Sequence, residues 1–164
     1  MGLYGRNARR AAFKEYICKC FERCYKQIML DEFTKKFSVG EAVQPGQYSP
    51  LTLAYIGDCV YELFVRTYLI RDANFPVKKL HKAATALVNA SAQAELYRKI
   101  EPELTEEELS VYKRGRNTNS HPPKNADLRD YKSATGVEAL VGYLYLKGNS
   151  ERIAYLMDKL VEGL

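Results

Sequence analysis

Apolar residues recur every three or four positions along most of the chain, which is the spacing of an amphipathic α-helix. Glycine and proline gather in a few short stretches, and these stretches divide the pattern into separate helical segments. No segment sustains the strict alternation of apolar and polar residues that is typical of a half-buried strand. The pattern therefore predicts an all-α fold, a bundle of helices around one core.

Capping residues set the limits of the predicted helices. Ser49 before Pro50 indicates a helix that runs to about residue 71, because serine caps a helix N-terminus and proline fits its first position. Pro76 opens a second long helix, which we expect to reach about residue 99. Thr105 and Glu108 have the spacing of a capping box and start a helix that ends near residue 115. Two further helices are predicted over residues 131–146 and from residue 150 onward, with loops over 40–50 and 115–130.

The helix predicted after Ser49 carries an acidic residue in apolar surroundings. Its segment LTLAYIGDCVYELF, residues 51–64, places Asp58 directly after Gly57. Burying an unpaired carboxylate costs several kcal/mol, and glycine inside a helix costs about 1 kcal/mol relative to alanine. Two such costs at adjacent positions require a compensating interaction.

The helix predicted over residues 131–146 repeats this combination. Glu138 lies among apolar neighbours in the segment ATGVEALVGYLYL. Gly136, Ala139 and Gly142 are three residues apart, so they are expected to line one face with almost no side-chain bulk. On the helix after Ser49, Ala54 and Gly57 are expected to do the same. Such small-residue faces let the backbone of another helix approach closely.

Two carboxylates brought together by close helices repel each other unless a cation lies between them. Hard oxygen donors favour Mg²⁺, with Mn²⁺ as a substitute, and Mg²⁺ is typically held by one or two carboxylates plus waters and a substrate phosphate. A metal held by Asp58 and Glu138 suits hydrolysis of a phosphodiester. Glu62, one turn after Asp58, is expected to act on this site from outside the coordination shell. The pattern equally allows each carboxylate to cap a helix end or to pair with an arginine.

The overall composition and charge are those of a single globular domain. The chain has 164 residues, 46% of them hydrophobic and 27% charged. Its net charge of +5 comes from residues 1–28, and the remainder is balanced. No run approaches the ~20 apolar residues that span a bilayer, so no membrane association is expected. The cysteines lack zinc-site spacing and are expected to be small buried residues in a reducing compartment; they are Cys18, Cys20, Cys24 and Cys59.

Two other segments stand out. An apolar helical stripe from Phe13 to Ile28 predicts an amphipathic helix that docks on the body or on a partner, unless Met29 is the natural start. Residues 113–132 hold six basic and two acidic residues, and loops of this length are usually functional. We predict that this patch binds a polyanion, with a solvated charged loop as the alternative.

The segment LAYIGDCVYEL resembles the signature helix of the ribonuclease III domain. The later segments KRGRN and ATGVEALVGYLYL resemble the short branch called Mini-ribonuclease III, which lacks an appended double-stranded-RNA-binding domain, and none is expected here. The likeness runs from about Ser49 to Leu164. It implies an N-terminal extension over residues 1–45 and a ribonuclease III-like catalytic domain over residues 46–164.

The resemblance implies a homodimeric endonuclease that cuts double-stranded RNA with Mg²⁺ and leaves 5′-phosphate ends, with Asp58 and Glu138 as metal ligands. Longer members of the family carry two further carboxylates, one turn earlier on each helix. Ala54 and Thr135 stand at those positions here, a reduction that the Mini branch shares. The implied substrate is precursor 23S ribosomal RNA in the cytoplasm, presented with the help of a ribosomal protein.

Without an appended RNA-binding domain, the catalytic domain must bind A-form RNA itself, through phosphates and 2′-hydroxyls. The histidines, His81 and His121, have no partner typical of a general base and are not expected to be catalytic. Two other functions stay open, a non-catalytic double-stranded-RNA-binding or ribosome-associated module on the same fold and a helical protein-interaction domain. The residues expected to contact RNA are Arg114, Arg116, Asn117, Lys124, Arg129 and Lys132, with a second set at Lys78, Lys79 and Lys82.

Overall fold

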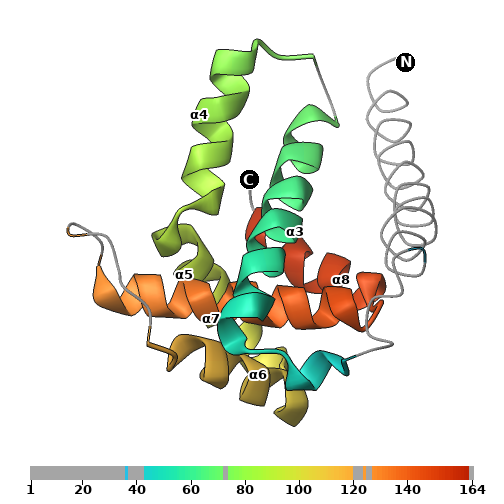
Figure 1. The fold of residues 1–164 in the computed structure, drawn as a ribbon. Coiled ribbons are helices and arrows are strands. Elements are labelled where there is room, and N and C mark those ends of the chain that lie inside the picture. Colours follow the sequence, from blue (N-terminus) through green and yellow to red (C-terminus); the bar gives the residue numbers. More distant parts are fainter. Residues whose placement is uncertain (1–35, 37–42, 72–73, 120–123, 125–126, 163–164) are drawn as a thin grey trace, which may run out of the picture.

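The structure is a computed structural model that describes residues 36, 43–71, 74–119, 124 and 127–162. Within these ranges the regular elements are all helices, which confirms the predicted fold class (Figure 1). In chain order they are η1 (Pro45–Gln47), α3 (Pro50–Ile70), α4 (Val77–Val88), α5 (Ala90–Ile100), η2 (Glu101–Glu103), α6 (Glu106–Arg116), α7 (Leu128–Leu146) and α8 (Ser150–Val161).

Helix α7 forms the centre of the bundle, and α3, α5 and α6 pack against it (Figure 1). Almost every residue from Ala134 to Leu144 is buried, and Val137, Ala139 and Leu140 have no exposed surface. A helix that is apolar on nearly all sides requires neighbours on all of those sides. The polar residue Glu138 is therefore held in the interior of the bundle by the position of its helix.

The predicted capping interactions are confirmed where the structure describes them. The Ser49 side chain accepts a hydrogen bond from the Thr52 backbone N–H at 3.1 Å and starts α3. Thr105 and Glu108 form the reciprocal capping box at the start of α6. These interactions satisfy backbone donors that a helix N-terminus leaves without an internal partner.

The prediction of one long helix from Pro76 to about residue 99 is wrong, because Asn89 divides it into α4 and α5. Asn89 has an extended backbone, and its Oδ1 accepts a hydrogen bond from Ala92 N–H at 2.9 Å. Its Nδ2 donates to the carbonyls of Thr85 and Ala86, both at 3.0 Å. One side chain thus ends α4 and begins α5 without the glycine or proline that usually indicates a break.

Helix α7 begins at Leu128, three residues before its predicted start. Asp127 is the N-cap, and its side chain accepts hydrogen bonds from the backbone N–H groups of Arg129 and Asp130. The carboxylate satisfies two free donors at the positive end of the helix dipole. The predicted polar loop is shorter at its C-terminal end for this reason.

Some predictions fall outside the described residues. The amphipathic helix from Phe13 to Ile28, the three cysteines within it and His121 all lie there. Cys59 is described and exposed, so the expectation that it is buried is wrong. Across the part of the chain that the structure describes, no helix has the length and apolar character needed to cross a membrane.

Candidate active site

Helices α3 and α7 meet backbone to backbone at two glycines. A Cβ added to Gly57 would lie 2.7 Å from the carbonyl carbon of Glu138 and closer still to its oxygen. A Cβ added to Gly142 would lie 2.9 Å from the carbonyl carbon of Leu53. Only glycine permits such an approach, so the prediction that Gly57 allows close packing is confirmed. Because Asp58 follows Gly57 directly, the contact brings both acidic positions to one helix crossing.

The small residues of α7 do not all face the same helix, in contrast to the sequence prediction. Gly142 packs against α3, whereas Gly136 packs against the ring of Tyr112 on α6, where an added Cβ would meet ring carbon Cε2 at 2.5 Å. Ala139 also faces α6, since a Cβ on Gly115 would lie 2.7 Å from the Ala139 Cβ. Residues three apart on a helix turn progressively around its axis, so three of them can serve two neighbours.

The Glu138 side chain is half-buried and accepts one hydrogen bond. Gln93 Nε2 on α5 donates to Glu138 Oε1 at 3.0 Å. The pKa of Glu138 is raised to about 7: loss of hydration is the main cause, the Gln93 hydrogen bond acts in the opposite direction, and the Asp58 charge adds a smaller increase. The ionised carboxylate is therefore unfavourable in this position unless a positive charge compensates it.

Asp58 lies at the edge of the same crossing and is exposed, so the expectation that it is buried among its apolar neighbours is wrong. Partial loss of hydration raises the pKa of Asp58, and the negative charge of Glu62 adds to this effect. Glu62 Oε1 accepts a hydrogen bond from Arg66 Nη2 at 2.6 Å. The structure thus places Glu62 where its charge acts on Asp58, as its position one turn away predicts.

Comparison with known proteins shows the family to which this pair of helices belongs. The family model described as the ribonuclease III domain matches residues 51–149, which include both acidic positions and the glycines between their helices. The chain belongs to the ribonuclease III family.

Proteins of the Mini-ribonuclease 3 type are similar to this chain over most of its length. Mini-ribonuclease 3 of Clostridium tetani is 47% identical over 141 residues, which cover 85% of this chain and 88% of that protein. Mini-ribonuclease 3 of Brevibacillus brevis is 48% identical over 123 residues, which cover 73% and 92%. These relatives place the chain in the Mini-ribonuclease III branch, and it is an endoribonuclease, as the sequence predicted.

A solved structure has the same fold. The crystal structure of a Fusobacterium nucleatum protein superposes with a TM-score of 0.66 at 34% sequence identity, and the match covers 71% of this chain and 94% of that one. The similarity supports the predicted ribonuclease III-like arrangement of helices around α7.

At the two positions where longer ribonuclease III enzymes are expected to carry carboxylates, this chain has buried residues without a charge. Ala54 and Thr135 are each 6% exposed. The Thr135 hydroxyl donates to the Tyr131 carbonyl at 3.1 Å. Among the residues that the structure describes, no group of three or more His, Cys, Asp or Glu side chains is close enough to hold a metal ion. Asp58 and Glu138 are therefore the acidic donors available at the crossing.

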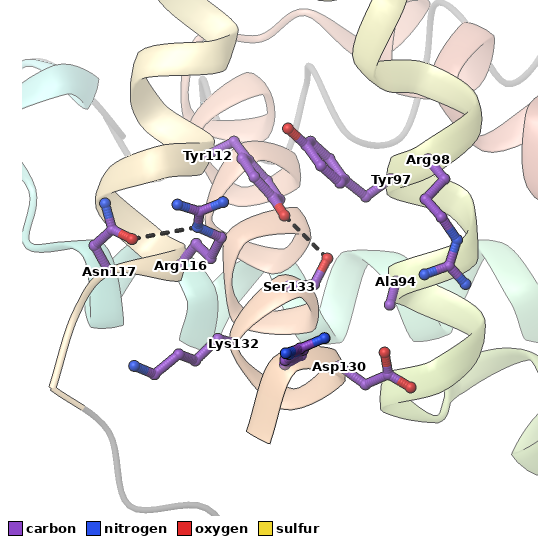
Figure 2. Close-up of a pocket in the computed structure, with 10 residues that line it drawn as sticks. Ala94, Tyr97, Arg98, Tyr112, Arg116, Asn117, Asp130, Lys132 and Ser133 are labelled. Atoms are coloured by element: carbon purple, nitrogen blue, oxygen red, sulfur yellow. Dashed lines mark hydrogen bonds between the residues drawn. The ribbon is translucent and has the colours of Figure 1, made fainter. Parts of the chain in front are cut away.

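A pocket of about 440 Å³ lies between α5, the end of α6 and the start of α7 (Figure 2). Its wall contains the rings of Tyr97 and Tyr112, which stack at 3.7 Å between centroids, and the Tyr112 hydroxyl is hydrogen-bonded to Ser133 at 2.9 Å. Four cationic side chains and one carboxylate share the lining, so the pocket is basic. The charged residues of the lining are Arg98, Arg116, Arg129, Lys132 and Asp130.

The structure brings together four of the nine residues expected to contact RNA, namely Arg116, Asn117, Arg129 and Lys132 in this pocket. Arg114 is instead directed to the Gly46 carbonyl, at 3.1 Å from Nη1. Lys124 is exposed outside the pocket. The second set, Lys78, Lys79 and Lys82, is exposed on the first half of α4, at the opposite end of the bundle from α6 (Figure 1).

The sequence did not identify Gln93 and Arg98, nor the other pocket-lining residues Ala94, Tyr97, Tyr112 and Ser133. Gln93 occupies a core position of α5, in register with Leu96 and Ile100, where an apolar residue is usual. That departure is a recognisable signal for a buried polar role. Arg98 carries no comparable signal, because charged residues on the outer face of a helix are ordinary.

Proposed function

We propose that this chain is a Mg²⁺-dependent endoribonuclease for double-stranded RNA, with Asp58 and Glu138 as the metal ligands. The observation that supports it is the backbone contact between Gly57 and Glu138, because it brings two carboxylates from different helices to one crossing. Mn²⁺ is expected to substitute for Mg²⁺, since both accept oxygen donors.

The structure disfavours the alternative roles for these two carboxylates. Asp58 lies in the middle of α3 and Glu138 in the middle of α7, so neither caps a helix end. Within the described residues neither of them forms an ion pair with a lysine, arginine or histidine. The pKa of both carboxyl groups is raised, chiefly by loss of hydration, and no cationic side chain among the described residues offsets this increase.

The donor set fits Mg²⁺, which is commonly held by one or two carboxylates while waters and a substrate phosphate complete its coordination. When bound, such an ion supplies activation of a water and stabilisation of the charge that develops on the phosphate. Asp58 on α3 and Glu138 on α7 would hold the ion. Glu62 strengthens the negative potential at Asp58, and Arg66 limits that effect by pairing with Glu62.

The experiment that tests this function is cleavage of a long labelled RNA duplex by the purified chain in Mg²⁺ and in EDTA, beside Glu138→Ala. A second substrate is a duplex formed by the paired ends of precursor 23S ribosomal RNA, which is the cytoplasmic target we propose. It is tested with and without added ribosomal proteins. Cleavage in Mg²⁺ that stops in EDTA supports the proposal. Binding without cleavage of either substrate would instead support the non-catalytic RNA-binding module.

We propose that the basic pocket holds phosphates of the RNA beside the cleavage site. The pocket contacts α7, and Ser133 and Lys132 in its lining precede Glu138 by five and six residues on that helix. Its four cationic side chains outnumber the single carboxylate of Asp130. Contacts of this kind release counterions from RNA, so binding should weaken steeply with salt.

The double variant Arg116→Ala, Lys132→Ala is expected to reduce the slope of log affinity against log salt concentration by about 1 to 2 for duplex RNA. Each lost phosphate contact removes about one released counterion. The measurement is fluorescence anisotropy of a labelled duplex at several salt concentrations, in the absence of divalent metal. Lys99→Ala is the control, because Lys99 is exposed at the end of α5 and belongs neither to the pocket lining nor to the basic patch of residues 113–132. An equal change of slope in the control would contradict the assignment.

A homodimer is proposed on the exposed face of α3. Four large apolar residues there reach solvent, including Tyr55 at 78% and Ile70 at 58% exposure, with Leu51 and Leu63 exposed to a lesser degree. Their spacing places them on one side of the helix, next to Asp58. Large apolar side chains exposed together on one face are a common feature of protein interfaces. We propose that residues 46–164 form the catalytic domain that dimerises and that residues 1–45 are an extension to it. Analytical ultracentrifugation is expected to give a mass of twice 18.7 kDa.

A further inference from the structure

Gln93 connects the proposed metal ligand Glu138 to the corner between α4 and α5. Its side chain is 1% exposed. Nε2 donates two hydrogen bonds, to Glu138 Oε1 at 3.0 Å and to the Val88 carbonyl at 3.2 Å. The opposite atom, Oε1, is buried and has no hydrogen-bond partner within the described part of the chain.

The orientation of this amide follows from its neighbours. A backbone carbonyl can only accept hydrogen bonds, so the Val88 carbonyl requires the nitrogen of the amide on its side. Rotating the amide by 180° would place Oε1 against that carbonyl and against Glu138 Oε1. The donor of Gln93 is therefore directed at Glu138 for a reason that does not depend on the charge of the carboxylate.

The corner that carries Gln93 is itself firmly held. Asn89 caps both helices through three hydrogen bonds, and the Tyr61 hydroxyl of α3 donates to the Leu87 carbonyl at 3.0 Å. The donor nitrogen is thus fixed by residues of α3, α4 and α5 together. A fixed donor can define the position of the carboxylate that it contacts.

Two partners explain why this core position carries an amide, the Val88 carbonyl and Glu138. Both accept from Nε2, while the buried Oε1 is left unpaired, which is unfavourable. The unpaired Oε1 indicates that the position is occupied by glutamine for the sake of its nitrogen. The nitrogen's two partners are a backbone carbonyl and Glu138, and only the second belongs to the active site.

We propose that Gln93 is a positioning residue, whose amide holds Glu138 Oε1 and thereby orients the carboxylate toward Asp58 for metal binding. This inference rests on the proposed function, because it takes Glu138 as a metal ligand. Glu138 Oε2 has no hydrogen-bond partner among the described residues and is left to the metal. Outer-shell hydrogen bonds of this kind reduce the freedom of a ligand before the metal arrives.

The test uses Gln93→Met, which keeps the length of the side chain and removes the donor. Binding of Mn²⁺ is measured directly from the loss of the electron paramagnetic resonance signal of free Mn²⁺, without RNA. The dissociation constant is expected to rise by about 10- to 100-fold, and the Mg²⁺ concentration for half-maximal cleavage by a similar factor. The KM for duplex RNA is expected to stay unchanged, because Gln93 is buried away from the RNA surface.

Two further variants keep the test decisive. Gln93→Leu should show the same loss of Mn²⁺ affinity, which protects against a local effect of methionine. Leu96→Val perturbs the core of the same helix without removing a hydrogen bond to Glu138 and should bind Mn²⁺ like the wild type. Thermal unfolding of each variant reports whether the fold is retained.

Unchanged Mn²⁺ affinity in folded Gln93→Met, or an equal loss in Leu96→Val, would overturn the inference and leave the proposed function standing. If the wild-type chain bound no Mn²⁺ and Asp58→Asn cut RNA at the wild-type rate, the metal site itself would be wrong. The inference would then fall with it. The two failures are distinguishable because the first concerns Gln93 alone.

Discussion

Glu138→Ala is expected to lower the rate of RNA cleavage by about three orders of magnitude while the fold is retained. Stabilisation of developing phosphate charge by a bound metal is worth several kcal/mol, and each 1.36 kcal/mol corresponds to a factor of ten in rate. Glu138 is one of the two carboxylates proposed as metal ligands, so its removal would leave Asp58 as the single proposed ligand. Single-turnover cleavage of a labelled duplex with enzyme in excess measures the rate without contribution from product release.

The same variant should change how stability depends on pH. The pKa of Glu138 is raised in the folded chain from 4.5 to about 7. Between these values the folded state binds more protons than the unfolded state, so the free energy of unfolding falls as pH rises. The shift lowers the free energy of unfolding by about 3 kcal/mol in total, and the full decrease is reached above pH 7. Metal-free Glu138→Ala should lack this decrease and be more stable than the wild type at pH 8 in urea unfolding.

A matched control removes an equal charge from the surface. Glu106→Ala changes an exposed carboxylate at the start of α6 and should leave both the cleavage rate and the pH dependence near their wild-type values. Cleavage by Glu138→Ala at a rate similar to that of Glu106→Ala would show that Glu138 is not a metal ligand.

Gly57→Ala is expected to cause the largest loss of stability of any single methyl addition in the described chain, at least about 3 kcal/mol. Overpacking a core typically costs about 1–3 kcal/mol when side chains can shift. Here the added methyl meets the backbone carbonyl of Glu138 and the Gly142 nitrogen, the latter at 2.7 Å, and backbone within a helix cannot shift alone. Helices α3 and α7 would have to separate, which also moves Asp58 away from Glu138.

Urea denaturation followed by circular dichroism measures the loss, and Gly46→Ala provides the comparison. A Cβ on Gly46 would meet no atom within 4 Å, and the residue has no positive φ. That variant should be neutral or slightly more stable, because alanine restricts the unfolded chain. If Gly57→Ala proved as stable as Gly46→Ala, the close packing of α3 on α7 would be refuted. Where Gly57→Ala still folds at low temperature, its cleavage rate should be strongly reduced.

The helix limits that the sequence predicted correctly depend on interactions within a few residues. The cap of α3 by Ser49 and the capping box of α6 involve partners three positions apart, so the local sequence contains all the information needed. The break at Asn89 also uses local hydrogen bonds. It was missed because asparagine is compatible with a helix surface, and its selection as a double cap depends on how α4 and α5 pack.

The sequence by itself determined the fold class, the two acidic positions and the glycine that brings them together. Asp58 and Glu138 are recognisable because a carboxylate among apolar residues is unfavourable if its helix is buried, which applies to Glu138, whereas Asp58 is exposed at the edge of the crossing. Only the tertiary structure decided that Gln93 contacts Glu138, that Gly136 serves α6 while Gly142 serves α3, and that the cations of three helices line one pocket. Each of these depends on which helix lies opposite and at what rotation, and helix periodicity within one segment does not specify its neighbour.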